Sequence, residues 1–440
     1  MERRVLAEKI VATLRSKGYE AYFAGGCVRD SLRGVEPHDF DIATNAHPQE
    51  VQKLFQKTIP VGVQFGVILV VEEGISFEVA TFRHEAGYVD GRRPTEVVFT
   101  NLKQDAIRRD FTVNGLYYDP QTKKTIDYVG GEADIKAKVI RTIGNPDDRF
   151  LEDHLRLMRA IRFSVQLGYE IEETTWKAIE KHHALIQKVS QERIREEFTK
   201  TLTSKDPARG VRLLDSSGLL KFILPEMEVM KGVEQPMEHH PEGDVFVHTM
   251  MLVEGLKEAP IELALGCLLH DVAKPATFVR APDRIRFHGH DTIGAEMSEK
   301  ICKRLTYSNE QTTLVCELVR EHLRFKDAFQ MRTSTLKRFL SLPRFDLHLE
   351  LHRLDCMASH QKLEAYHFCK AKYEEFLKLP PPPLRLINGQ DLIERGFKPG
   401  PEFSKILRAV EDAILEGTVH TREEALKFLE ENYPSHEGKA

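Results

Sequence analysis

Residues 21–42 read AYFAGGCVRDSLRGVEPHDFDI, in which an apolar run leads into two glycines and then into two aspartates one residue apart. The run 21–24 predicts a short strand, and residues 28–32 predict the start of a helix. Paired glycines such as Gly25 and Gly26 let the backbone approach an anion, because no Cβ intervenes. The free N–H groups of a helix start favour phosphate. We therefore expect a strand, a phosphate-binding turn and a helix in this order.

The two aspartates, Asp39 and Asp41, alternate with Phe40 and Ile42. Successive side chains of a strand point to opposite faces, so we expect both carboxylates on one side of a strand. Metal ions held by such a pair would activate a 3′-hydroxyl group and neutralise a leaving pyrophosphate. Arg29 would add a charged fork to a triphosphate. This arrangement is typical of the nucleotide transfer that polymerases catalyse.

A third carboxylate comes from the alternating segment 75–80, which predicts another strand and places Glu78 on it. Taken alone, a D-x-D pair or a Gly-Gly pair is common by chance and usually has no catalytic meaning. The order Gly-Gly, Arg, D-x-D and then a strand carboxylate is far more specific. We therefore treat Asp39, Asp41 and Glu78 together as the candidate catalytic residues.

Further motifs follow in a fixed order downstream: Phe82-Arg83-His84-Glu85, Arg92-Arg93-Pro94, Arg108-Arg109-Asp110-Phe111-Thr112-Val113-Asn114 and Glu152-Asp153-His154-Leu155-Arg156. Together with the glycine turn and the D-x-D pair, they resemble the class II tRNA nucleotidyltransferases, the CCA-adding enzymes, and the related bacterial poly(A) polymerases. The resemblance extends over about residues 22–200. It implies addition of CMP and AMP from CTP and ATP to the 3′ end of tRNA.

The resemblance also implies a role for each matching residue. Asp39 and Asp41 would bind Mg²⁺. The helix that begins with residues 191–196 would support the nucleotide pocket. The residues that contact the nucleotide and its triphosphate would be Gly25, Gly26, Arg29 and Arg109, with Asp110 and Asn114 on the sugar side.

Asp153 and Arg156 are three residues apart, so we expect them on one face of a helix. An aspartate accepts a hydrogen bond and an arginine donates one. Cytosine and adenine both present an amino donor beside a ring-nitrogen acceptor, whereas uracil and guanine present the opposite order. The pair would therefore accept C and A and reject U and G, whose polar edges would stay unsatisfied. Arg159 and Arg162 continue this face and would contact phosphate or support the pair; an ordinary helix salt bridge is the simpler alternative.

A second constellation of possible ligands lies between residues 245 and 360, and comprises His248, His270, Asp271, His290, His322 and Asp355. Histidine and carboxylate ligands suit Mn, Ni, Fe or Mg better than a structural zinc site. A metal centre of this kind would activate water against a phosphate ester. The order of these residues resembles the HD phosphohydrolase superfamily. The alternative is an inactive helical domain; the remaining histidines there, which we expect at the surface or around the ligands, are His239, His240, His288 and His360.

The expected fold class is α+β, with a polymerase-β-like nucleotidyltransferase head followed by helical parts. The head would comprise residues 1–140, and an all-α neck with the base-recognition motif would comprise residues 141–228. An HD metal-binding body would follow over residues 229–375. A helical tail over residues 376–440 would contact the tRNA.

Composition fits this organisation. A chain of 440 residues with 41% hydrophobic and 30% charged residues predicts two to four globular domains. The sequence contains no run of eighteen apolar residues, so we expect no membrane span. The six cysteines have no C-x-x-C spacing, which predicts reduced thiols and a cytoplasmic protein. The net charge of −5 does not favour RNA binding, but local clusters such as residues 108–109 and 156–162 would bind a short RNA end.

The sequence leaves open which related activity the chain has. The segment 82–97 holds a complete E-x-x-Y-x-D-x-R-R-P core, which the family's CC-adding members have shortened, so we expect competence to add A. Full CCA addition is the first hypothesis. The alternatives are an A-adding specialist, a poly(A) polymerase, or a protein whose working chemistry is the HD phosphohydrolase. We expect a monomer or a homodimer.

Overall fold

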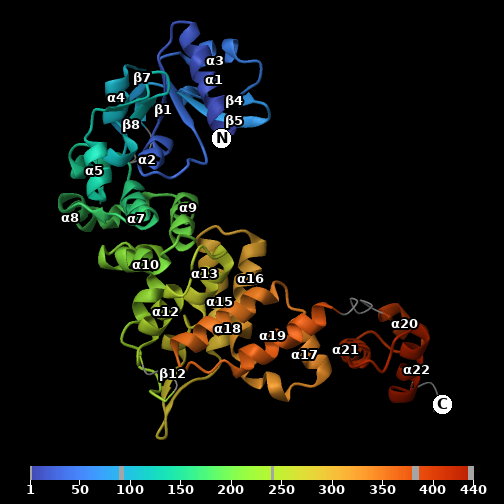
Figure 1. The fold of residues 1–440 in the computed structure, drawn as a ribbon. Coiled ribbons are helices and arrows are strands. Elements are labelled where there is room, and N and C mark those ends of the chain that lie inside the picture. Colours follow the sequence, from blue (N-terminus) through green and yellow to red (C-terminus); the bar gives the residue numbers. More distant parts are fainter. Residues whose placement is uncertain (1, 89–93, 239–241, 379–385, 435–440) are drawn as a thin grey trace. The chain divides into compact units, whose positions relative to one another are not determined.

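The structure is a computed structural model that describes residues 2–88, 94–238, 242–378 and 386–434 (Figure 1). The chain divides into two compact units. The first comprises residues 1–229, 256–261 and 301–307, and the second comprises residues 230–255, 262–300 and 308–440.

The first unit is built on a seven-stranded sheet of order β3-β4-β5-β2-β1-β8-β9. All neighbouring strands are antiparallel except β2 and β5, which are parallel. The strands are β1 (Ala21–Ala24), β2 (Asp41–Thr44), β3 (Thr58–Gly62), β4 (Val67–Glu72), β5 (Ile75–Thr81), β8 (Leu116–Asp119) and β9 (Lys124–Asp127). A separate hairpin pairs β6 (Arg83–Tyr88) with β7 (Pro94–Phe99).

The register of the sheet brings the candidate residues together. Ala24 of β1 pairs with Asp41 on one side and with Tyr117 on the other. Ile42 pairs with Val79, so Asp41 and Glu78 occupy neighbouring positions on adjacent parallel strands. Residues paired across strands share a face of the sheet. The Asp41 and Tyr117 side chains therefore lie on the same face.

Five helices belong to the head within the described residues. They are α1 (Glu2–Ser16), α2 (Gly26–Leu32), α3 (Pro48–Leu54), α4 (Leu102–Ile107) and α5 (Gly131–Ala137). Leu102 and Ala106 of α4 belong to a buried cluster with Ala24, Ala43 and Tyr117. Helix α4 thus covers part of the face on which Asp41 lies.

Helices follow the sheet in the same unit, although the segment 141–228, expected to be all-α, also contains the short strand β11 (Glu170–Ile171). The helices are α6 (Pro146–Glu152), α7 (Arg156–Leu167), α8 (Glu173–His182), α9 (Gln191–Leu202), α10 (Pro207–Ser216) and α11 (Leu220–Ile223), and β11 pairs in parallel with β10 (Val139–Ile140). Helices α9 and α10 approach closely at Gly210, where a Cβ would lie 2.3 Å from Thr201 Cγ2. Only glycine fits this crossing without a shift of the neighbouring helix.

The second unit is almost entirely helical. Its elements are α12 (Val245–Glu254), α13 (Ile261–Leu269), α14 (Lys274–Thr277), the hairpin β12 (Phe278–Arg280) and β13 (Ile285–Phe287), α15 (His290–Arg304), α16 (Asn309–Glu321), α17 (Thr333–Leu340), α18 (Phe345–Ala358), α19 (Glu364–Leu377), α20 (Gly389–Glu394), α21 (Pro401–Glu416) and α22 (Arg422–Asn432). The ends of α13 and α15 belong to the first unit. The last three helices bury a hydrophobic cluster of their own around Leu392, Val410 and Leu429. The division into four domains stays a prediction.

Two general expectations can be compared with these elements. Across the described ranges, none of the helices has both the length and the apolar character needed to cross a lipid bilayer. All six cysteines are buried and carry free thiols.

Aromatic side chains and histidines share one core of the second unit. Phe325, Phe339 and Phe345 are fully buried, and the His352 ring stacks on Phe325 with 4.1 Å between ring centroids. His348 is 1% exposed, and neither of its ring nitrogens has a hydrogen-bond partner within the described ranges. Burial lowers the pKa of His348 to about 4, because the cation is disfavoured there.

This histidine predicts a loss of stability in mild acid. The pKa of His348 in the folded state lies below its ordinary value of 6.5. The free energy of unfolding is therefore not reduced by His348 above pH 6.5, and it decreases as the pH falls from 6.5 toward 4, because only the unfolded protein readily takes up the proton. Between pH 7 and pH 5, His348→Leu is expected to gain about 2 kcal/mol relative to the parent protein. Urea unfolding at the two pH values measures this difference. The exposed His360→Leu is the control, and an equal pH response in both variants contradicts the interpretation.

Candidate functional site

A cavity of about 620 Å³ lies in the first unit, at the edge of the sheet where Gly25 follows β1 and Asp41 begins β2. It brings together sequence-predicted residues that are far apart in the chain. Those that line it are Gly25, Gly26, Arg29, Asp41, Glu78, Arg109, Asp110, Asn114, Asp153, Arg156, Arg159 and Arg162. Asp39 is the predicted residue of this site that does not line the cavity.

The glycine turn forms one wall. Gly25 has φ of 71°, in the left-handed region that favours glycine, and its N–H donates to the Leu116 carbonyl oxygen at 2.9 Å. A Cβ on Gly25 would lie 3.0 Å from Arg109 Nη1. Helix α2 begins directly after this residue, two residues earlier than the sequence predicts. The turn thus allows a guanidinium to lie against the backbone.

Arg29 is only 5% exposed and is fixed in place by its partners. Its Nη1 donates to Asn114 Oδ1 at 2.7 Å, and its Nε and Nη2 donate to Asp30 at 2.9 and 3.0 Å. Asn114 in turn donates to Asp110 Oδ1 at 3.3 Å. These bonds tie the α2 wall to the segment that follows α4.

The carboxylates of Asp41 and Glu78 lie at the open side of the cavity. The pKa of Asp41 is raised to about 6, because the surrounding protein displaces water from the carboxylate and because Glu78 and Asp39 are negatively charged; Arg109 opposes this rise. Carboxylates that repel one another in this way suit a divalent cation, which relieves the repulsion. The residues present therefore fit a magnesium-type site.

Asp39 differs from the expectation of two carboxylates on one strand. Strand β2 begins only at Asp41, so Asp39 lies before the strand and is not held by its alternation. Its side chain is 83% exposed and accepts a hydrogen bond from Arg3. The prediction that Asp39 and Asp41 share one face of a strand is therefore wrong, because the pairing of β2 with β1 ends at Ala24, opposite Asp41.

Asp153 and Arg156 also differ from the prediction, because they do not lie on one helix. Helix α6 ends at Glu152 and α7 begins at Arg156, so Asp153 has extended backbone in the joint between two helices. Asp153 accepts from Arg193 Nη2 at 3.0 and 3.2 Å. Arg156 Nη1 donates to Glu152 Oε2 at 2.7 Å. Both side chains line the cavity, but each one bonds to a partner of its own.

Arg159 and Arg162 form the remaining wall and are held by the partly buried Asp110 and the buried Glu197. Arg159 donates from Nε and Nη2 to Asp110 Oδ2 at 2.9 and 2.5 Å. Arg162 Nε bonds to Glu197 Oε2 at 2.5 Å, and Arg159 Nη1 lies 3.6 Å from Glu197 Oε1. Glu197 is 3% exposed and was missed in the sequence. Its position four residues after Arg193, on the same face of α9, was the available signal.

The charges of the cavity suit a polyanion. The arginines that line it outnumber the carboxylates, and they are Arg29, Arg83, Arg108, Arg109, Arg156, Arg159 and Arg162. Arginine forks bind phosphate oxygens with two parallel hydrogen bonds. The cavity thus places cationic groups and a carboxylate pair within one space, as a nucleoside triphosphate with its metal requires.

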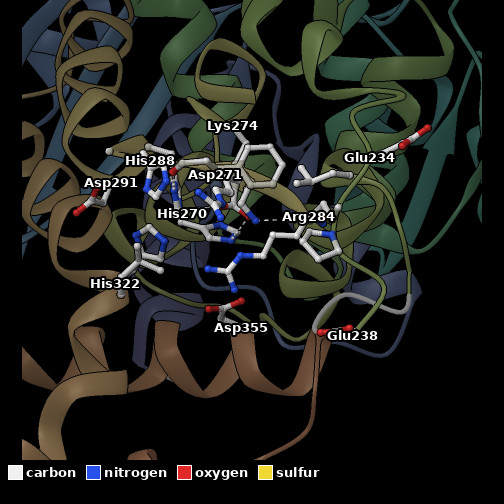
Figure 2. Close-up of a pocket in the computed structure, with 18 of the residues that line it drawn as sticks. Glu234, Glu238, His270, Asp271, Lys274, Arg284, His288, Asp291, His322 and Asp355 are labelled. Carbon is white, nitrogen blue, oxygen red and sulfur yellow. Dashed lines mark hydrogen bonds and ion pairs between the residues drawn. The ribbon is translucent and has the colours of Figure 1, made fainter. Parts of the chain in front are cut away.

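A second cavity, of about 990 Å³, lies in the second unit. Figure 2 shows His270, Asp271, His322 and Asp355 among its lining side chains. The possible ligand atoms form two groups in which all atoms lie within 4.8 Å of one another: His248, His270 and Asp271, and Asp271, His290 and His322. Asp355 Oδ1 lies 3.1 Å from His248 Nε2. All six sequence-predicted ligands are therefore close together.

The orientation of three of these histidines fits a metal ion. The Nδ1 atoms of His270, His290 and His322 lie 2.9, 2.7 and 2.6 Å from backbone carbonyl oxygens of Cys267, Phe287 and Val319. This bonding directs Nε2 into the cavity. The buried His270 Nε2 and His290 Nε2 atoms both lie close to the Asp271 carboxylate, at 3.1 Å from Oδ2 and 3.4 Å from Oδ1.

The protonation states of two of these residues also suit metal binding, whereas hydrogen bonds to Asp355 and Glu242 raise the pKa of His248 to about 9 despite its burial. Burial and the neighbouring His270 lower the pKa of His322 to about 4, so its ring is neutral. Burial opposes ionisation of Asp271, but His270 and Lys274 outweigh it and lower the pKa of this carboxyl. Neutral imidazole and ionised carboxylate are the forms that bind metals.

The other residues around this cluster have different positions. Glu242 Oε1 lies 2.8 Å from His248 Nδ1, and this partner was missed because nothing in its sequence context marks it. His288 lines the cavity, whereas His360 is exposed and accepts from the Lys362 N–H at 3.0 Å. His239 and His240 lie outside the described residues.

Three family models match the chain. They are described as the Poly A polymerase head domain over residues 21–141, the Probable RNA and SrmB- binding site of polymerase A over residues 168–231, and the HD domain over residues 243–347. These matches confirm the resemblances of the motifs to the nucleotidyltransferases and to the HD superfamily.

Curated relatives match over nearly the full length. The CCA-adding enzyme of Latilactobacillus sakei subsp. sakei (strain 23K) is 35% identical over 428 residues, which cover 95% of this chain and 96% of that protein. The CCA-adding enzyme of Anoxybacillus flavithermus (strain DSM 21510 / WK1) is 33% identical over 427 residues, which cover 96% and 95%.

Solved structures confirm the expected α+β fold with a polymerase-type head. The Bacillus stearothermophilus CCA-adding enzyme in complex with CTP matches with a TM-score of 0.74 at 27% identity, over 98% of both chains. The Thermotoga maritima CCA-adding enzyme complexed with tRNA matches with a TM-score of 0.57 at 20% identity, over 97% of this chain and 94% of that one. At this lower identity the likeness concerns the fold alone.

The carboxylate of Glu197 predicts a stability effect. Glu197→Gln removes the buried anion that Arg159 and Arg162 share, so two guanidinium groups lose their common counter-charge. Because breaking a buried ion pair is costly, we expect unfolding to become easier by about 3 kcal/mol in urea titrations. Glu192→Gln, at an exposed position of the same helix, is the control. Equal unfolding midpoints for the two variants would contradict the assignment.

Proposed function

The chain belongs to the family of CCA-adding enzymes, which are nucleotidyltransferases, and from this premise we propose that it adds CMP and AMP to the 3′ end of tRNA. CTP and ATP would be the substrates. The observation that carries the proposal is that Asp41 and Glu78 line one cavity together with Arg29, Arg109 and the other arginines. The CTP complex of the Bacillus stearothermophilus relative supports cytidine addition.

The carboxylates would hold Mg²⁺, as the raised pKa of Asp41 supports. The metal would supply charge neutralisation for the triphosphate and activation of the tRNA 3′-hydroxyl group. Asp39 would join Asp41 after leaving Arg3. Their ion pair is largely exposed, with side chains 49% and 83% accessible, so its loss would cost little.

The remaining residues would bind and orient the nucleotide. Gly25, Gly26, Arg29 and Arg109 would contact the triphosphate, and Asp110 and Asn114 would contact the sugar. Asp153 and Arg156 would read the base edge by accepting from its amino group and donating to its ring nitrogen. To do so, each would exchange its partner in the free protein, Arg193 or Glu152, for the base. Arg159 and Arg162, held by Asp110 and Glu197, would support the base-reading pair from the adjoining wall of the cavity.

Several finer points stay predictions. The contact of residues 376–440 with tRNA, a cytoplasmic location, and the choice between monomer and homodimer are among them. Part of the E-x-x-Y-x-D-x-R-R-P segment, residues 89–93, lies outside the described residues. Full CCA addition remains the favoured activity over the A-adding specialist and the poly(A) polymerase, because the full-length relatives cited above are named for it.

Extension of three transcripts of one tRNA tests the proposal. The transcripts end before CCA, after C and after CC, and CTP and ATP are supplied singly and together. We expect all three to be completed to CCA and to stop there. Addition of a single A to the CC-ended transcript alone would indicate an A-adding specialist, and long A tails would indicate a poly(A) polymerase.

Asp41→Asn serves as the matched loss-of-function variant in the same assay. Incorporation should fall by a factor of roughly a thousand or more, because the ligand charge for the metal is lost. Glu72→Gln is the control, since Glu72 lies on β4 and pairs with Lys9 instead of lining the cavity. Normal incorporation by Asp41→Asn would overturn the metal assignment.

A second activity is supported by the histidine cluster. We propose that His248, His270, Asp271, His290, His322 and Asp355 hold a divalent metal, with Mn, Ni, Fe and Mg as the candidates. The buried Nε2 atoms of His270 and His290, which converge on the Asp271 carboxylate, support this proposal. The metal would activate water for hydrolysis of a phosphate ester, and Lys274, 2.7 Å from Asp271 Oδ2, would add positive charge beside it.

Metal analysis of the purified protein separates this activity from nucleotide addition. His270→Ala is expected to lose most of the bound metal, measured by elemental analysis after dialysis against each candidate ion. It should also lose hydrolysis of bis(p-nitrophenyl) phosphate while tRNA extension continues. His360→Ala is the control. Unchanged metal content in His270→Ala would overturn the metal site; retained metal without hydrolysis in the parent protein would overturn the hydrolase alone.

A further inference from the structure

Arg109 is held by two buried groups that lie behind the cavity. Its Nε donates to the Tyr117 hydroxyl oxygen at 3.0 Å, and its Nη2 lies 3.4 Å from Asp105 Oδ2. The Tyr117 hydroxyl donates to the same Asp105 oxygen at 2.5 Å. Tyr117 is fully buried and Asp105 is 1% exposed, whereas the Arg109 side chain is 20% exposed and lines the cavity.

Asp105 is an unusually well satisfied buried anion. Its Oδ1 accepts from the Arg83 N–H at 3.1 Å and from Arg108 Nε at 2.8 Å, in addition to the contacts of Oδ2. Burial alone would raise the pKa of Asp105, but Arg108, Arg109 and the Tyr117 hydroxyl outweigh it and lower the pKa to about 2. A carboxylate held from this many directions is a rigid acceptor.

We propose that Tyr117 and Asp105 are positioning residues that fix the Arg109 guanidinium for the triphosphate of the incoming nucleotide. This inference rests on the proposed nucleotidyltransferase function. The two residues would not touch the substrate themselves. Tyr117 bridges the anion and the cation, so that Nε is occupied and the fork cannot turn away from the cavity.

The sheet register makes this arrangement part of the glycine turn. Tyr117 of β8 pairs with Ala24, the residue before Gly25. Arg109 Nη1 faces the position where Gly25 lacks a Cβ and lies 3.4 Å from the Asn114 carbonyl oxygen. The guanidinium is therefore held between the turn and Tyr117, over whose ring it lies at 5.0 Å from the centroid. Its free edge is directed by the same strands that place Asp41.

The consequence for substrates is specific. A triphosphate is common to CTP and ATP, so a loosened Arg109 weakens both equally and leaves the choice of base unchanged. The residues proposed to read the base, Asp153 and Arg156, belong to other elements and have other partners. A defect shared by both nucleotides thus separates triphosphate positioning from base reading.

Tyr117→Phe removes only the bridging hydroxyl. Because a hydrogen bond to a charged group is lost, we expect kcat/KM to fall roughly tenfold for CTP and for ATP alike, with unchanged rejection of UTP and GTP. Binding of inorganic tripolyphosphate, measured by calorimetry, should weaken by a similar factor. Tyr118→Phe is the matched control: the next tyrosine of β8 packs near Phe23, 6.3 Å between centroids, and does not line the cavity. Asp105→Asn, which keeps the size of the side chain, should show the same shared defect.

The possible outcomes test the positioning role of Tyr117 and Asp105 separately from the nucleotidyltransferase function. Unchanged tripolyphosphate binding in both Tyr117→Phe and Asp105→Asn, with a lowered melting temperature, would show a purely structural role and overturn the proposal. A defect confined to one nucleotide would also overturn it. A parent protein that binds tripolyphosphate but extends no tRNA would defeat the proposed function, while the binding comparison would still decide whether Tyr117 and Asp105 position Arg109.

Discussion

The pairing of β1 with β2 on one side and β8 on the other is the constraint on which the nucleotide cavity depends. Ala24 lies between Asp41 and Tyr117, and the next residue, Gly25, bonds through its N–H to Leu116. A slip of one residue in either ladder would turn the side chains to the other face of the sheet. The short strands therefore control, at the same time, the carboxylate, the backbone turn and the tyrosine behind Arg109.

Electrostatics explain why so many arginines can share this cavity. Several of the guanidinium groups are each bonded to a carboxylate that is itself little exposed, as in Arg159 with Asp110 and Arg162 with Glu197. Neutralisation in place avoids the cost of gathering like charges in a partly dry space. The histidine cluster of the second unit follows another rule. The pKa values of His290 and His322 are lowered beside the Asp271 carboxylate, whereas hydrogen bonds to Asp355 and Glu242 raise the pKa of His248 to about 9 despite its burial.

Much of both sites could be predicted because their residues are carried by local motifs. The order of Gly25, Arg29, Asp41 and the later arginines depends on short segments, and the cavity gathers them as expected. The predictions that were wrong concern the local backbone conformation. The alternation of Asp39 and Asp41 suggested a strand, but strand length depends on a partner, and β1 offers none beyond Ala24. The partner Glu197 comes from the distant helix α9, and a single sequence does not state which helices meet. Glu242 lies in a turn shortly before α12, and nothing in its sequence context marks it as a partner of His248.

The joint between α6 and α7 has a consequence for how this chain can vary. Asp153 is tied to Arg193 of α9, while Arg156 opens α7, and between them His154 and Leu155 are buried. A helix turns about 100° per residue, so one residue added to or removed from this joint would swing Arg156 around the axis of α7 while Asp153 stayed in place. The length of this joint is therefore more tightly constrained than the identity of any one of its side chains, and insertions or deletions here would separate Asp153 from Arg156.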